Sequence, residues 1–321
     1  MTDLSKMGEN EAISRLSRKL QPAPAGVVGI GDDTAVVPGP RAPGAQQILT
    51  SDAVIEGRHY FPETDPLRVG RKAVNRVLSD IAAMGGTPSY LLVNVVAPPT
   101  CDMDWLDRAY EGMDAATTAF NATILGGDLT PGPLVEFHVF GVGEVPSSGA
   151  ILRSGACPTD VIMVTGTLGG SLQGKHLDFT PRIEEGQFLR TWATAMMDLS
   201  DGLAMDLHRM CMKSGTGALV HLPKLPVDPA VHALENTSLK PWEHILFDGE
   251  DYELLFTIPS DCASDFMTAW KEQFELRCAP VGIMTKEAGI IKLLDDDEQE
   301  TPLTDEMMKD YGLQAFHKDA P

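Results

Sequence analysis

Short apolar segments with the periodicity of strands and helices alternate along the whole chain, and clusters of glycine and proline separate them. Pro66–Met84 places apolar residues three or four positions apart, as an amphipathic helix does, and Gly85-Gly86 ends the pattern. Tyr90–Ala97 is a nearly continuous apolar run, which is typical of a buried strand. Because both halves of the chain mix such segments, the sequence predicts two mixed domains of the α+β or α/β class.

The chain has 321 residues, which is enough for two compact domains. The clearest linker is Pro146-Ser147-Ser148-Gly149, because proline, serine and glycine favour turns and connections. We therefore predict one domain over residues 1–148 and a second over residues 149–321.

Several features predict a cytoplasmic protein that crosses no membrane. The sequence contains no run of 18 apolar residues, and the segment Met1–Gln21 is charged and lacks the apolar core of a signal peptide. The five cysteines are an odd number and form no CxxC pair, so we expect reduced thiols rather than disulfides or a zinc site.

The charge balance argues against a nucleic-acid-binding protein. The chain carries 46 acidic and 25 basic residues, a formal net charge of −21, and such a field repels polyanions and anionic membranes. A ligand that carries phosphate would need cations, or locally gathered amides and basic side chains, to enter this field.

Carboxylates recur beside glycine, serine or threonine at six places that we interpret as turns at the ends of strands or helices. Carboxylate and hydroxyl oxygens are the ligands that Mg²⁺ prefers, and Mg²⁺ binds through a few carboxylates together with substrate phosphates. The alternative is that each aspartate only makes local turn hydrogen bonds. The six places are Gly31-Asp32-Asp33, Thr50-Ser51-Asp52, Ser79-Asp80, Gly126-Gly127-Asp128, Asp198-Leu199-Ser200-Asp201-Gly202 and Gly249-Glu250-Asp251.

Common catalytic signatures do not occur in the sequence. It has no GxxxxGK[ST] or GxGxxG nucleotide motif, no GxSxG nucleophile elbow and no HExxH zinc motif. The glycine-rich stretch Gly166–Gly170 is by itself weak evidence for phosphate contact. These absences argue against nucleophilic and zinc-dependent hydrolysis.

Eight segments, in this order along the chain, resemble the motifs of the thiamine-monophosphate kinase family. They extend from Gly29 to Phe256, and a weaker similarity follows at Lys309–Phe316. The segments are Gly29–Ala35, Ser51–His59, Val74–Gly85, Gly126–Asp128, Arg153–Gly155, Gly166–Gly169, Asp198–Leu203 and Gly249–Phe256.

The resemblance implies two α+β domains of the aminoimidazole-ribonucleotide synthetase-like type. The N-terminal domain would bind ATP and Mg²⁺ and form a homodimer, and the C-terminal domain would complete the nucleotide and substrate sites. The implied reaction is ATP-dependent phosphorylation of thiamine monophosphate to thiamine diphosphate by direct in-line transfer. One alternative is another ATP-using enzyme of the same superfamily, and a second is a non-catalytic ATP- and Mg²⁺-binding regulator.

The resemblance also implies roles for individual residues. It implies no acid or base catalyst, and instead metal-assisted transfer through Asp52, Asp80, Asp128, Asp198 and Asp201. The implied ligands of several Mg²⁺ ions are Asp33, Thr50, Ser51, Asp52, Asp80, Asp128, Asp198 and Asp201. The implied ATP contacts are Gly127, Asp128, Arg153, Ser200 and Tyr110, and the implied substrate contacts are His59, Glu250 and Tyr311, with Phe316 as an alternative to Tyr311.

Three positions depart from the family pattern. Asp248 stands where the family has glycine, Gly170 stands where it often has aspartate, and the segment Gly174–Pro181 is short. None of these departures falls on an implied metal carboxylate.

Overall fold

The computed structural model describes residues 15–16, 18–22, 43–234, 237–304 and 307. The chain divides into two compact units, one of residues 1–81 and 86–149 and the other of residues 82–85 and 150–321. All five cysteines carry free thiols, as the sequence predicts. None of the described helices is long and apolar enough to cross a membrane.

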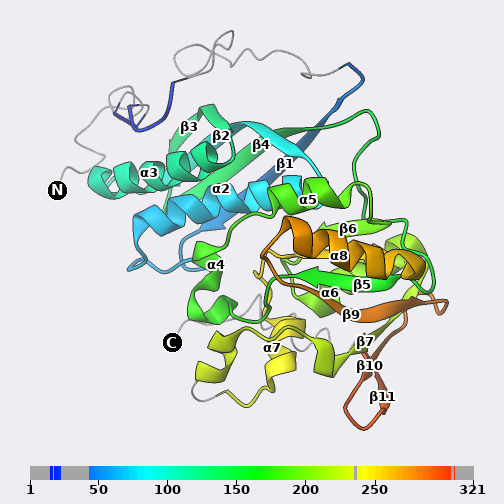
Figure 1. Ribbon diagram of the computed structural model, residues 1–321. Helices are drawn as coiled ribbons and strands as arrows, with labels where there is room; N and C mark the ends of the chain where they lie inside the picture. Colours follow the sequence, from blue (N-terminus) through cyan, green and yellow to red (C-terminus); the bar gives the residue numbers. More distant parts are fainter. Residues whose placement is uncertain (1–14, 17, 23–42, 235–236, 305–306, 308–321) are drawn as a thin grey trace. The chain divides into compact units, whose positions relative to one another are not determined.

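The first unit contains a four-stranded mixed sheet with the strand order β1-β4-β2-β3 (Figure 1). Strands β2 and β3 are parallel, whereas β4 pairs antiparallel with both β1 and β2. The strands are β1 (Gln46–Ile55), β2 (Thr87–Ala97), β3 (Thr123–Pro131) and β4 (Glu136–Val145).

Helix α2 (Pro66–Ala83), except for its last two residues, and helix α3 (Met103–Ala119) belong to this unit and approach each other closely. A Cβ atom added at Gly70 of α2 would lie 1.8 Å from the carbonyl oxygen of Ala109 on α3. Helix α2 also packs on the sheet, since a Cβ atom at Gly141 of β4 would lie 2.2 Å from Val77. Glycine at these positions therefore lets the layers come together.

The opposite face of this sheet presents apolar side chains to solvent. Phe140 of β4 pairs with Ser51 of β1 and Leu92 of β2, and paired residues lie on the same face of a sheet. Leu49 lies two positions before Ser51 and so shares that face. The side chains of Leu49, Leu92 and Phe140 are 75%, 42% and 51% exposed.

The second unit contains a seven-stranded mixed sheet with the strand order β11-β10-β7-β9-β5-β8-β6. Strands β10 and β7 are parallel, and the other neighbours are antiparallel. The strands are β5 (Val161–Thr165), β6 (Ala195–Asp198), β7 (Gly217–His221), β8 (Leu254–Ile258), β9 (Cys278–Thr285), β10 (Ile291–Leu294) and β11 (Glu300–Pro302).

Strand β8 is buried on both faces. Leu255 packs in an apolar cluster with Leu207 and Ile245, whereas the ring of Phe256 lies 5.7 Å from that of Phe266 in a group of aromatic rings. Helices of this unit are α4 (Lys175–Asp178), α5 (Ile183–Leu189), α6 (Leu203–Ser214), α7 (Pro241–Phe247) and α8 (Ala263–Gln273). Short 3₁₀ helices are η2 (Ser171–Gln173), η3 (Leu222–Lys224), η4 (Pro229–Ala233) and η5 (Ser260–Cys262).

Two interpretations of the carboxylate motifs as turns were wrong. Strand β1 continues to Ile55, so Asp52 lies inside a strand, and β3 continues through Gly126-Gly127-Asp128 to Pro131. Pairing with neighbouring strands satisfies the backbone there, and this tertiary contribution outweighs the turn preference of glycine and aspartate.

We expect Gly70→Ala to lower the free energy of unfolding by about 1–3 kcal/mol, because the added methyl group would overlap the backbone of α3. Urea denaturation measures this change. Gly126→Ala is the control, since its Cβ atom would meet only Leu92 at 3.4 Å, an ordinary contact. Equal stability of the Gly70 and Gly126 variants would contradict the close approach of the two helices.

Candidate active site

Strand β1 and helix α2 bring three of the predicted metal ligands together in the first unit. The hydroxyl group of Thr50 donates a hydrogen bond to the carboxylate of Asp80. Burial raises the pKa of Asp52, and the negative charge of Asp80 raises it further. Ser51 lies between Thr50 and Asp52 on the strand, and its side chain therefore points to the opposite face.

Asp52 is bound by an arginine that we did not predict. Nε and Nη2 of Arg76 lie 2.9 Å and 2.8 Å from the two carboxylate oxygens of Asp52, the forked geometry of a strong ion pair. Nη1 of Arg76 donates to the carbonyl oxygen of Ala53 at 2.7 Å. This positive charge opposes the effect of burial on the pKa of Asp52.

The imidazole of His59 has a defined orientation at the end of β1. Its Nδ1 accepts a hydrogen bond from the backbone N–H of Ile55 at 3.0 Å. Nζ of Lys72, a fully buried lysine, donates to the backbone oxygen of His59 at 2.8 Å. Because Nδ1 is an acceptor, the neutral ring carries its proton on Nε2, which is a hydrogen-bond donor.

The predicted nucleotide residues of the first unit differ in exposure. A Cβ atom at Gly127 would lie 1.7 Å from the carbonyl oxygen of Val93, so only glycine fits at this position of β3. Asp128 is exposed and accepts a hydrogen bond from Thr130 at 2.9 Å. Tyr110 is only 8% exposed, and burial raises the pKa of its hydroxyl group.

In the second unit, backbone hydrogen bonds join the predicted nucleotide and substrate motifs. The N–H groups of Glu250 and Tyr252 donate to the carbonyl oxygens of Ser200 and Leu199 at 2.9 Å and 2.8 Å. The N–H of Leu199 donates to Glu253 at 2.8 Å. These bonds extend the pairing of β6 with β8, so two motifs 50 residues apart in sequence lie side by side.

A buried aspartate holds the loop that follows β6. Oδ2 of Asp206 accepts hydrogen bonds from the backbone N–H groups of Ser200 and Asp201, at 3.0 Å and 2.9 Å. Asp206 is fully buried, and burial raises its pKa to about 7. Nη1 of Arg209 donates to Oδ1 of Asp206 at 2.9 Å and also contacts the carboxylate of Asp201.

Both carboxylate oxygens of Glu250, a predicted substrate contact, have polar neighbours within the second unit. The hydroxyl group of Tyr252 donates to Oε1 at 3.0 Å, and Nδ1 of His176 lies 3.4 Å from Oε2. The ring of Phe179 stacks on that of Tyr252 with centroids 4.0 Å apart. His176 and Phe179 belong to the short segment that departs from the family pattern, so this segment contributes to holding Glu250.

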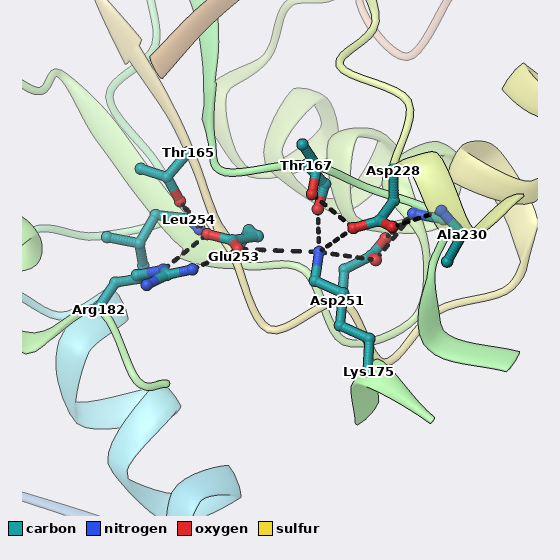
Figure 2. Close-up of polar contacts among 10 residues, drawn as sticks. Thr165, Thr167, Lys175, Arg182, Asp228, Ala230, Asp251, Glu253 and Leu254 are labelled. Carbon is teal, nitrogen blue, oxygen red and sulfur yellow. Dashed lines mark hydrogen bonds and ion pairs between the residues drawn. The ribbon is translucent and has the colours of Figure 1, made fainter. Parts of the chain in front are cut away.

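A polar network supports the glycine-rich turn between β5 and η2 (Figure 2). The carboxylate of Asp251 accepts from the N–H of Gly169 at 2.8 Å, and Asp228 accepts from the hydroxyl group of Thr167 at 2.6 Å. Nζ of Lys175 lies within 4.0 Å of carboxylate oxygens of Asp228, Asp251 and Glu253. It also donates to the backbone oxygen of Thr167.

Glu253 has a second cationic partner in Arg182 (Figure 2). Nε and Nη2 of Arg182 donate to the two carboxylate oxygens of Glu253 at 2.8 Å and 2.6 Å. Thr165 donates to the same carboxylate at 2.7 Å. Motif spacing could not pair such residues with their carboxylates, because the pairs depend on tertiary contacts. The partners that the sequence analysis missed are Arg76, although it lies inside the Val74–Gly85 motif, and Lys175, Arg182, Asp206 and Arg209.

For the remaining predicted site residues, the structure gives at most their exposure. Asp33 and Tyr311 lie outside the described residues, as does Phe316. Arg153 is exposed on the second unit, and Asp198 is buried at the end of β6. The roles of all predicted site residues stay predictions.

The described side chains partly fit a magnesium site. Among them, no three His, Cys, Asp or Glu residues lie close enough together to hold a metal ion. The first unit nevertheless gathers two carboxylates, Asp52 and Asp80, and the hydroxyl group of Thr50. Hard oxygen donors of this kind suit Mg²⁺, which usually completes its coordination with water and substrate phosphate.

Comparison with known proteins identifies the family. The N-terminal and C-terminal domains described as AIR synthase related protein match residues 31–145 and 170–292. The thiamine-monophosphate kinase of Rhodopirellula baltica is 37% identical over 275 residues, which cover 82% of this chain and 86% of the relative. The chain belongs to the thiamine-monophosphate kinase family.

Solved structures of the thiamine-monophosphate kinase family agree with this assignment. The enzyme from Stenotrophomonas maltophilia K279a superposes with a TM-score of 0.78 at 29% identity, covering 89% of this chain and 96% of that one. AaThiL complexed with AMPPCP and TMP superposes with a TM-score of 0.72 at 28% identity, covering 94% and 97% of the two chains. The predicted family and the two predicted mixed α/β domains are confirmed.

We expect the stability of the protein to fall as the pH rises from about 4 to about 8 because of Asp251. Burial raises the pKa of this carboxyl group from the usual 3.8 to about 8. Between these values the folded chain binds a proton that the unfolded chain releases, so deprotonation favours unfolding. Asp251→Asn should flatten the pH dependence measured by urea denaturation, by at most about 1.4 kcal/mol per pH unit.

Asp228→Asn is the matched control from the same network. Burial tends to raise the pKa of Asp228, but hydrogen bonds from Thr167 and Ala230 outweigh it and leave the pKa below its usual range. The control should therefore keep the wild-type slope between pH 5 and pH 8. If the stability of the Asp251 variant fell with pH as steeply as that of the wild type, the raised pKa of Asp251 would be contradicted.

Proposed function

We propose that this protein transfers the terminal phosphoryl group of ATP to thiamine monophosphate and releases thiamine diphosphate and ADP. The observation that carries this proposal is the similarity to thiamine-monophosphate kinases through both units of the chain. AaThiL, which has the same fold, holds AMPPCP and TMP together. The hydrogen bonds between the motifs at 198–202 and 249–253 support a nucleotide site and a substrate site built side by side in the second unit.

We propose a binding role for each of the two predicted domains. The first domain, residues 1–148, binds ATP and magnesium, and the second, residues 149–321, completes the nucleotide and substrate sites. Bound Mg²⁺ supplies positive charge that neutralises the phosphates as they approach. The residues that would hold it are Asp33, Thr50, Asp52, Asp80, Asp128, Asp198 and Asp201. The side chain of Ser51, also predicted as a ligand, points to the opposite face of the sheet from those of Thr50 and Asp52.

Other residues of the chain bind and orient the two substrates. Arg153 pairs with the phosphates of ATP, for which its forked guanidinium group is suited. Nε2 of His59, which carries the proton of the neutral ring, donates a hydrogen bond to the phosphate of thiamine monophosphate. Glu250 contacts thiamine monophosphate, and Tyr252 and His176 hold its carboxylate in place.

The acceptor needs no general base from the protein. A phosphate monoester has a second pKa near 6, so its attacking oxygen has largely lost its proton at pH 7. This oxygen forms a bond to the γ-phosphorus while the bond from that phosphorus to the ADP oxygen breaks, and no proton has to move. Positioning and charge neutralisation therefore account for catalysis.

Phosphorus NMR of the protein with ATP, Mg²⁺ and thiamine monophosphate tests the reaction. We expect new diphosphate resonances of thiamine diphosphate and ADP. Asp80→Asn should lower the rate roughly 10- to 100-fold and raise the Mg²⁺ concentration needed, because it removes a negative ligand. Glu272 is exposed on α8, so Glu272→Gln should change neither the rate nor the Mg²⁺ concentration needed. Intact ATP, or free phosphate without thiamine diphosphate, would refute the proposed reaction.

We also propose that the protein is a homodimer formed through the first unit. The free face of its sheet exposes Leu49, Leu92 and Phe140, and large exposed apolar patches mark interaction sites. A second copy of the same face would cover these side chains, because a twofold axis brings identical patches together.

Phe140→Asp should convert the dimer to a monomer, because it places a charge in an interface that excludes water. Light scattering after size-exclusion chromatography measures the mass. Ile290→Asp, at a residue of the second unit that is 46% exposed, should leave the dimer intact. A monomeric wild-type protein, or a dimeric Phe140 variant, would contradict this interface.

A further inference from the structure

Arg209 of α6 connects two aspartates of different burial. Its Nη1 contacts the carboxylate of Asp201 and lies 2.9 Å from Oδ1 of Asp206. The side chain of Asp206 is completely buried, whereas that of Asp201 is 45% exposed and that of Arg209 is 40% exposed. One cation thus joins a fixed carboxylate to one that faces solvent.

The backbone of this loop does not depend on the arginine. The other oxygen of Asp206, Oδ2, already accepts the N–H groups of Ser200 and Asp201. Leu199 and Ser200 are further held by the backbone of the 249–253 motif. Arg209 therefore adds little to the position of the main chain, and its principal effect falls on the side chain of Asp201.

Arg76 at Asp52 is a useful comparison. Arg76 donates to both oxygens of Asp52 and to the backbone oxygen of Ala53, and its side chain is only 14% exposed. Moving it away would remove three contacts in a partly buried place. Arg209 is more exposed and uses a single nitrogen for both of its contacts, so it can turn into solvent while water replaces them.

We propose that Arg209 is a resident countercation for Asp201: it pairs with this carboxylate when no divalent cation is bound, and it weakens cation binding there. The inference rests on the proposed metal role of Asp201. A positive charge within a few ångströms of a bound cation repels it, and the ion pair must loosen before the carboxylate can bind metal fully. In the ion-free protein the same charge offsets repulsion between Asp201 and Asp206.

The test measures the affinity of Mn²⁺, a probe for Mg²⁺, without nucleotide. Free Mn²⁺ is followed by its EPR signal at fixed pH and ionic strength. Arg209→Gln should bind Mn²⁺ about three- to tenfold more tightly than wild type, because it removes one nearby positive charge. Arg209→Lys keeps the charge and should stay close to wild type.

Arg108→Gln is the matched control. Arg108 pairs with Asp65 at 2.8 Å on the surface of the first unit, with exposed fractions of 56% and 44%, so the control removes the same charge from an ordinary ion pair. Its Mn²⁺ affinity should equal that of wild type. In EDTA, Arg209→Gln should have a lower melting temperature than wild type, because Asp201 and Asp206 then lack their shared cation.

Asp201→Asn separates this inference from the proposed function. If it weakens Mn²⁺ binding while Arg209→Gln leaves the affinity unchanged or reduces it, the role of Arg209 is wrong and the metal role of Asp201 stands. If Asp201→Asn leaves Mn²⁺ binding unchanged, the metal role of Asp201 is wrong and the inference about Arg209 is wrong with it.

Discussion

Cationic side chains hold the carboxylates of both units in defined positions. A chain with a net charge of −21 can gather carboxyl groups in one place only if a carboxyl group keeps its proton, as Asp251 does below about pH 8, or positive charge offsets their repulsion. Arg76 does this for Asp52, and Arg182 does it for Glu253. Lys175 lies among three carboxylates at once. The geometry of the candidate site in each unit depends on these pairs.

These ion pairs contribute more to geometry than to stability. Taking both charges of a buried pair out of water costs free energy that their attraction only partly returns. Glu253 is 2% exposed and Arg182 is 18% exposed, so their forked hydrogen bonds chiefly fix the strand that follows the Glu250 motif. Loss of one partner would leave the other charge buried and unpaired, which is strongly unfavourable.

The regular elements could be predicted from local pattern, but the surroundings of the site could not. Helix α2 and strand β2 lie where the apolar spacing of Pro66–Met84 and the apolar run Tyr90–Ala97 predict them. Helix α7 was not predicted, because it has only seven residues and follows a proline-rich connection. Asp52 was predicted from its motif, whereas its partner Arg76 lies 24 positions away and meets it only through the packing of α2 on β1.

Burial divides the carboxylates of the second unit into two kinds. Asp206, Asp251 and Glu253 are at most 2% exposed, and the first two accept backbone N–H groups that fix the loop after β6 and the glycine-rich turn. Asp201 and Glu250 are 45% and 28% exposed and stand on backbone that the buried residues hold. A carboxylate that stands on a fixed backbone but faces solvent can exchange an arginine or histidine for a ligand without disturbing the fold. In this way, the buried carboxylates give the two predicted site residues, Asp201 and Glu250, a fixed starting position.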